Sequence, residues 1–120
     1  MVDIKEIHDF AVKWIAKFKD KRINYLELVD HYLADDCDAL GFEMDCGRAF
    51  KKKYGISVGN YEDLETIIDE VMDIPLLGSV IYSKWRYFNH WAYDVREILE
   101  PKNRAWFILA LRRLEVLSRD

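Results

Sequence analysis

The residues best suited to chemistry lie on one half of a helix that the apolar pattern predicts over residues 76–93. At about 100° per residue, that half holds no carboxylate and collects hydroxyl, amide, imidazole and guanidinium groups. Arg86 could present a planar fork to a carboxylate or phosphate, and His90 one turn later a switchable hydrogen-bond donor. The pattern therefore predicts a ligand or partner face made of Tyr82, Arg86, Asn89, His90 and Tyr93.

The same composition has a second interpretation, because an ordinary exposed helix face carries Glu and Lys. Hydroxyl, amide and guanidinium groups also suit a half-buried surface on which each group is hydrogen-bonded. Other helices of the chain would then cover this half, and the helix 75–93 would be central in the fold. Both interpretations predict that the polar half is shielded from water.

Nucleophilic catalysis would need a serine or cysteine beside a base. Ser83 and His90 share the polar half but are seven residues apart. Seven residues span about 10 Å along a helix, which is too far for a direct hydrogen bond. We therefore predict no catalytic residue, and a small enzyme or ligand-binding domain that uses Arg86 and His90 is the alternative to a non-catalytic module.

A second cluster contains atom types that bind metals: His31, Asp35, Asp36, Cys37, Asp38, Asp45 and Cys46. Its spacing matches no CxxC, HxxxH or EF-hand pattern. Two cysteines nine residues apart are more often small buried hydrophobic residues. We expect no metal and no cofactor.

Basic residues concentrate at Lys51–Lys53 and at Arg112 and Arg113, but the chain has a formal net charge of −4. A protein that coats nucleic acid needs a basic surface to neutralise phosphates. A lysine run that ends a helix also complements the helix dipole. We therefore expect no nucleic-acid partner.

Composition predicts one compact domain over residues 1–120, since 51% of the residues are hydrophobic and 33% are charged. Five glycines and two prolines leave few turn residues for an all-β fold, so we predict an all-α fold. Charges interrupt every apolar stretch, which excludes a membrane span. No signal-peptide pattern precedes the first helix, so a cytoplasmic location is expected.

Apolar spacing and capping residues predict five or six helices in an orthogonal or bundle-like array. Asp3 caps the first helix, whose core stripe is Ile7, Phe10, Ala11, Trp14, Ile15 and Phe18. Asn24 starts a short second helix, after which Asp35 and Asp36 loosen the chain. A third helix is predicted over residues 38–54, a fourth from Asn60, and later ones near Pro75 and from Pro101.

The C-terminal helix is apolar over more than one face. Its core stripe is Trp106, Phe107, Ala110, Leu111, Leu114 and Leu117, whereas Ala105, Ile108, Leu109 and Val116 lie outside that arc. Either another helix of the chain or a second copy in a two-fold homodimer must cover the extra strip. The sequence thus favours a non-catalytic helical interaction or regulatory module whose partner is another protein or itself.

Overall fold

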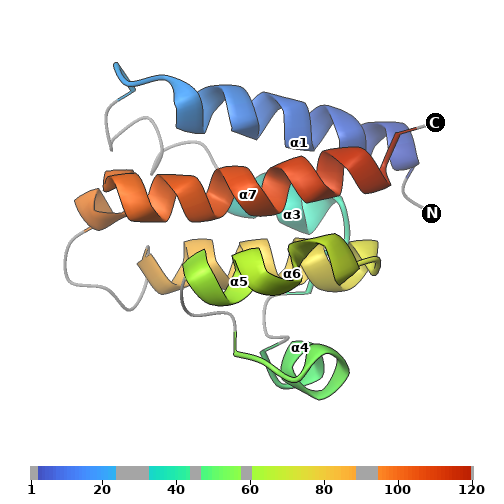
Figure 1. The fold of residues 1–120 in the computed structure, drawn as a ribbon. Helices are drawn as coiled ribbons and strands as arrows, with labels where there is room; N and C mark the ends of the chain where they lie inside the picture. Colours follow the sequence, from blue (N-terminus) through green and yellow to red (C-terminus); the bar gives the residue numbers. More distant parts are fainter. Residues whose placement is uncertain (1–2, 24–32, 44–46, 58–60, 89–94, 120) are drawn as a thin grey trace.

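The computed structural model describes residues 3–23, 33–43, 47–57, 61–88 and 95–119 (Figure 1). This part of the chain is helical and contains no strand, which confirms the predicted all-α class. With the labels of Figure 1, the α-helices are α1 (Ile4–Lys19), α3 (Leu33–Ala39), α4 (Gly47–Tyr54), α5 (Tyr61–Ile67), α6 (Ile74–Arg86) and α7 (Pro101–Leu117). Two 3-10 helices, η1 (Ile68–Glu70) and η3 (Val95–Leu99), precede α6 and α7.

The helices form a layered array in which α7 lies between α1 on one side and α5 and α6 on the other (Figure 1). The first and last helices run antiparallel along their whole length. α6 contacts α3, α4 and α7, so it has the covered position expected of a central helix, and it shares that position with α7. α4 is farthest from α1 and packs against α6.

α1 forms where the sequence predicts it. The Asp3 carboxylate accepts the backbone N–H of Lys5 at 3.0 Å, which satisfies an otherwise unpaired donor at the helix start. The buried stripe holds five of the six predicted residues: Ile7, Phe10, Ala11, Trp14 and Phe18. Ile15 is only partly buried, because it faces the edge of the contact with α7.

An aromatic cluster joins α1, α6 and α7. The rings of Phe18 and Phe107 are stacked, with centroids 4.6 Å apart and planes 4° from parallel. Trp85 makes edge contacts with Trp14 at 5.9 Å and with Phe107 at 6.4 Å. Each of these rings is at most 2% exposed, so the cluster supplies a large share of the apolar area buried on folding.

The predicted single helix over residues 38–54 is wrong, because α3 ends at Ala39 and α4 begins at Gly47. Gly41 has a φ of 76°, in the left-handed region where glycine commonly ends a helix. The backbone N–H of Phe42 then donates to the carbonyl of Cys37 at 3.0 Å and closes the turn. Sequence spacing missed this stop because apolar residues continue on both sides of it.

The expected break at Asp35 and Asp36 is also wrong. Both lie in the first turn of α3, where a carboxylate complements the helix dipole. The short helix predicted from Asn24 falls on residues 24–32, outside the described residues, as does the N-cap Asn60. The later boundaries are confirmed: Gly55 ends α4 with a φ of 80°, and Asp73 caps α6 by accepting the N–H of Leu76 at 3.0 Å.

One side of α6 needs a residue without a side chain. A Cβ placed on Gly78 would collide with the ring of Phe42, which packs directly on the helix. Gly78 and its neighbour Ser79 are both buried. The turn at Gly41 therefore folds the chain back over the polar half of α6. The helix predicted over residues 75–93 is α-helical from Ile74 to Arg86, and Tyr87 after it is 56% exposed.

Arg104 locks the start of α7 to the end of α1. Its guanidinium donates from Nε to the carbonyl of Leu99 at 2.8 Å. The Nη1 atom donates to the carbonyls of Phe18 at 3.1 Å and Asp20 at 3.2 Å. Carbonyls at the C-terminal end of a helix lack partners within the helix, so Arg104 acts as a cap supplied from another element.

Replacing Arg104 by Met should lower the free energy of unfolding by about 1–2 kcal/mol, the usual loss when charged hydrogen bonds to partly buried carbonyls are removed. Arg112→Met is the matched control, because Arg112 is exposed and has no hydrogen-bond or ion-pair partner in the part of the chain described. It should change stability by less than about 0.5 kcal/mol. Urea unfolding followed by circular dichroism measures both, and equal effects would contradict the capping role.

Candidate functional site

The polar half of α6 is covered where the structure describes it. Tyr82 is 5% exposed, and its hydroxyl donates to the carboxylate of Asp38 on α3 at 2.7 Å. Ser79, one turn earlier, is also 5% exposed. This part of the predicted face is therefore occupied by α3 and the chain around Phe42, and Tyr82 serves as an internal hydrogen-bond donor.

Arg86 is half-buried at the end of α6 and makes no hydrogen bond or ion pair with another described residue. Its charge is close enough to lower the pKa of Tyr82 slightly, against stronger effects that raise it. Asn89, His90 and Tyr93 lie outside the described residues. A joint site of Arg86 and His90 therefore stays a prediction.

Burial raises the pKa of Tyr82 to about 12, and the hydrogen bond to Asp38 acts in the same direction. A buried phenolate would lose its hydration and would repel the neighbouring carboxylate. The folded state therefore favours the neutral phenol, whose ordinary pKa is 10.0. The contribution of Tyr82 to stability is complete below pH 10 and is lost as the pH rises towards about 12.

Tyr82→Phe should lower the free energy of unfolding by about 1–3 kcal/mol at neutral pH, because it leaves the Asp38 carboxylate without its donor. Above about pH 10 the difference from wild type should shrink, since only wild type loses the phenol contribution there. Urea melts at several pH values measure this. Tyr87→Phe, at a position 56% exposed, is the control and should change stability little at any pH. A constant difference across the alkaline range would refute the coupling.

The acidic and cysteine cluster is also used for packing. The Asp36 carboxylate accepts from the Trp14 indole at 2.8 Å and from Lys13 Nζ at 2.9 Å. Cys37 is a free, buried thiol, and burial together with the charges of Asp36 and Asp38 raises its pKa. His31, Asp45 and Cys46 lie outside the described residues. Within the described ranges, no three His, Cys, Asp or Glu side chains are grouped to hold a metal ion.

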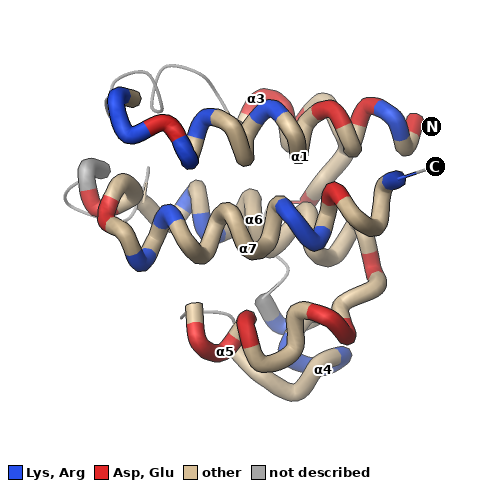
Figure 2. Tube along the Cα trace, turned by 45° about the horizontal axis from the view of Figure 1, so that its top comes forward, with Lys and Arg blue, Asp and Glu red and all other residues tan. Residues whose placement is uncertain are grey.

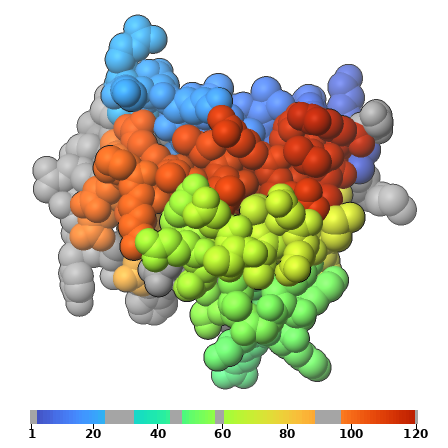
Figure 3. All heavy atoms as spheres, viewed as in Figure 1, coloured from blue at the N-terminus to red at the C-terminus, as the bar shows by residue number. Residues whose placement is uncertain are grey.

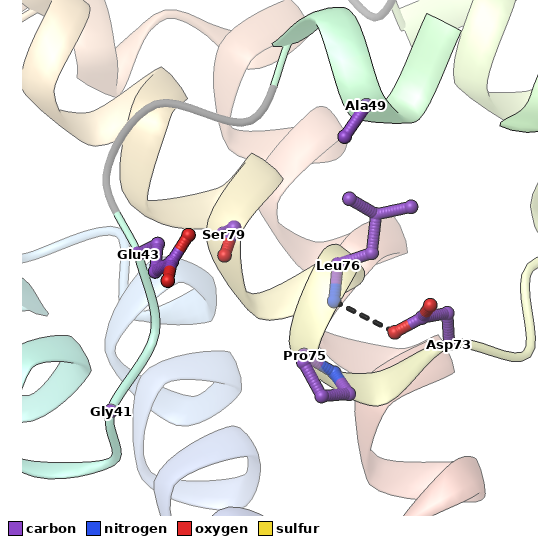
Figure 4. Close-up of a pocket in the computed structure, with 7 residues that line it drawn as sticks. All are labelled: Gly41, Glu43, Ala49, Asp73, Pro75, Leu76 and Ser79. Carbon is purple, nitrogen blue, oxygen red and sulfur yellow. Dashed lines mark hydrogen bonds between the residues drawn. The ribbon is translucent and has the colours of Figure 1, made fainter. Parts of the chain in front are cut away.

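A small pocket lies between the start of α6, α4 and the turn after α3 (Figure 4). It encloses about 330 Å³ and is lined by Gly41, Glu43, Ala49, Asp73, Pro75, Leu76 and Ser79. The Asp73 carboxylate is already engaged by the N–H of Leu76 at 3.0 Å and by Lys53 Nζ at 2.9 Å. The lining includes no histidine that could act as a general base for the Ser79 hydroxyl.

The basic residues do not form one surface. Lys53 is paired with Asp73, whereas Lys51 and Lys52 are exposed on α4. Arg113 donates to the carbonyls of Val71 and Asp69 at 2.9 Å each and so fastens the end of η1 to α7. Figure 2 shows α4 separated from the basic residues of α7 and of the second half of α1. This arrangement lacks the continuous basic stripe that phosphate binding needs.

A groove with a mainly apolar lining lies between α1 and α7. We call it the α1/α7 groove; it has a volume of about 480 Å³ and is lined by Val12, Ile15, Ala16, Lys19, Arg112, Glu115, Val116 and Arg119. Val12 is 48% exposed and Val116 44% exposed. Figure 3 shows the side chains of the two helices meeting along this edge of the surface.

The groove explains what becomes of the extra apolar strip on the C-terminal helix. Ile108 and Leu109 pack partly against the core, because α1, α5 and α6 together surround most of α7. Val116 is left outside this contact. The chain therefore covers most of the strip itself, and the uncovered remainder joins an outer stripe of α1.

That outer stripe of α1 was not predicted from the sequence, although its signal is present. Ile4, Val12 and Ile15 recur at helical spacing along the edge of the core stripe. Among the described residues, three of the five exposed large hydrophobic side chains lie on α1 and α7: Ile4, Val12 and Val116. An apolar cluster of this kind, bordered by charges, is typical of an interaction site.

No protein-family model, curated protein or solved structure matches this chain. Its function must therefore be inferred from its own residues. No helix in the described ranges is long and apolar enough to cross a membrane.

Proposed function

We propose that the protein is a non-catalytic helical module that binds another protein through the α1/α7 groove. The observation that carries this proposal is the pair of half-exposed valines, Val12 and Val116, which face the same groove from two different helices. A folded domain gains little by leaving branched apolar side chains in water, and a partner that covers them recovers the free energy of their burial.

The fate of the polar half of α6 also supports the proposal. The Tyr82 hydroxyl is engaged in a hydrogen bond to Asp38, and Gly78 is covered by the ring of Phe42. The part of this face that the structure describes has an internal role and offers no open surface to a ligand. An enzyme that uses Arg86 and His90 would have to work without the Tyr82 hydroxyl, which is bound to Asp38.

We place the module in the cytoplasm, a compartment in which a free cysteine such as Cys37 stays reduced. A protein partner fits the size of the groove better than a small molecule does. Small-molecule sites surround most of their ligand, whereas this groove is bounded by two helical walls and is open along its length.

Affinity capture from the cells that express the chain, read by quantitative mass spectrometry, tests the proposal. Val12→Glu and Val116→Glu each place a charge in the groove at a half-exposed position, so both variants should keep the wild-type melting curve. Met72→Glu is the matched control, because Met72 is 65% exposed and is not part of the groove.

We expect at least one captured protein to be lost with both groove variants and retained with the control. When that protein is purified, its affinity for either groove variant should be weaker by tenfold or more, as is usual when a central interface residue is replaced by a charge (roughly 1.4 kcal/mol or more). The proposal fails if every captured protein is insensitive to both groove variants.

A further inference from the structure

We propose that the α1/α7 groove binds an amphipathic helix of a different protein, whose apolar stripe is flanked by carboxylates. This inference rests on the proposed function and names the chemistry of the partner. The apolar stripe of the partner would pack on the apolar floor of the groove. The basic residues on the rim of the groove would favour acidic residues beside that stripe.

The shape of the groove suits a helix. On each wall the lining residues are spaced by three and four along the helix: Val12, Ile15, Ala16 and Lys19 on α1, and Arg112, Glu115, Val116 and Arg119 on α7. Seven residues of helix rise about 10 Å, so the floor is about two turns long. A third helix laid along two antiparallel ones inserts side chains at positions i, i+3 or i+4, and i+7, the usual arrangement of helix-in-groove recognition.

The charges of the groove are unbalanced. Glu115 is its one carboxylate, and it is held by both the Nε and the Nη2 atoms of Arg119 at 2.9 Å. The His8 ring also lies beside it, with Nε2 3.8 Å from Glu115 Oε1. Lys19 and Arg112 are exposed and have no carboxylate partner in the described part of the chain.

Two such cations on the rim of an apolar groove favour a partner whose carboxylates lie opposite Lys19 and Arg112. Rim charges of this kind act mainly on specificity and on the rate of association. Figure 2 shows that further basic residues lie along the second half of α1. An acidic partner would therefore be attracted and a basic one repelled before either reached the valines.

A second copy of the chain is a poorer occupant. Two-fold pairing of groove with groove would bring together two surfaces that each carry Lys19, Arg112 and Arg119 against one carboxylate, Glu115, which Arg119 already engages. Like charges brought together in an interface oppose association. The acidic α5 of a second copy does not solve this, because it has only seven residues and its Leu64 is fully buried in its own core.

A displayed helix library tests the inference even though the partner is unidentified. Every member keeps an apolar stripe at positions i, i+3, i+4 and i+7, and the flanking positions are randomised among Glu, Lys, Gln and Ser. The library is selected against wild-type protein and against the charge-reversed variant Lys19→Glu/Arg112→Glu. The control variant Lys51→Glu/Lys52→Glu makes the same charge change on α4, outside the groove.

We expect the wild type and the control to enrich Glu over Lys at the flanking positions, and the charge-reversed variant to enrich Lys. Synthetic winners should bind wild type with an affinity about tenfold higher than the charge-reversed variant, because the variant replaces two attractive rim charges with two repulsive ones. Val12→Glu should abolish binding of the same peptides. Equal enrichment of Glu and Lys, or the same preference in all three proteins, would overturn the inference.

Failure of the inference can be told apart from failure of the proposed function. If affinity capture finds a groove-dependent partner but the library shows no preference for Glu, the groove binds protein and the acidic helix is wrong. Light scattering tests whether a second copy of the chain occupies the groove. A wild-type dimer that Val12→Glu converts to a monomer would assign the groove to a second copy and overturn the inference.

Discussion

The antiparallel contact between α1 and α7 is the constraint on which the rest of the structure depends. The first and last helices of the chain are brought together by the stacked rings of Phe18 and Phe107, 4.6 Å apart. Arg104 fixes the same end of the pair by binding the carbonyls of Phe18 and Asp20. Near the other end, the His8 ring lies within 3.3 Å of the Glu115 carbonyl. These contacts fix how far the two helices are shifted along each other. The other helices pack around this pair.

The surface follows from that alignment. Because Trp14 and Phe18 turn one face of α1 into the core, Val12 and Ile15 are directed to its edge, where Val116 of α7 also lies. Neither helix alone presents a binding surface of useful size. A substitution that shifted α1 along α7 would separate Val12 from Val116 without changing either residue.

Helix α6 has a different role. Its apolar side joins the aromatic cluster through Trp85, and its polar side is held by α3 through Tyr82 and Asp38. A helix held from both sides is well suited to support α7 and poorly suited to meet a ligand in the part described. Tyr82 resembles a functional residue in the sequence because a buried hydrogen bond and a binding site need the same side chains.

Local signals in the sequence were sufficient for much of the fold. The Asp3 and Asp73 caps, the prolines Pro75 and Pro101, and the core stripe of α1 all depend on neighbours within one or two turns. The helix end at Gly41 could not be predicted, because its apolar flanking residues resemble a continuing helix and the positive φ is stabilised by packing of Phe42 on Gly78.

The candidate site was predicted less well. The excess apolar surface of the last helix is visible in its sequence, but which residues remain uncovered depends on how α1, α5 and α6 surround it. Val116 was named as one of four residues outside the core arc, whereas Val12 was not, although its helical spacing with Ile4 is visible in the sequence. Contacts more than 100 residues apart along the chain leave no local pattern.

The most direct test of acidic-helix binding in the groove is methyl NMR of Ile, Leu and Val labelled protein, titrated with an acidic helix selected on the wild type. We predict that the methyl signals of Val12, Ile15 and Val116 shift together, at the same ratio of peptide to protein. Leu76, in the pocket beside Asp73, and Val80, on the far side of the core, should stay unchanged. Shifts centred on Leu76 or Val80, with the groove valines unchanged, would contradict binding in the groove.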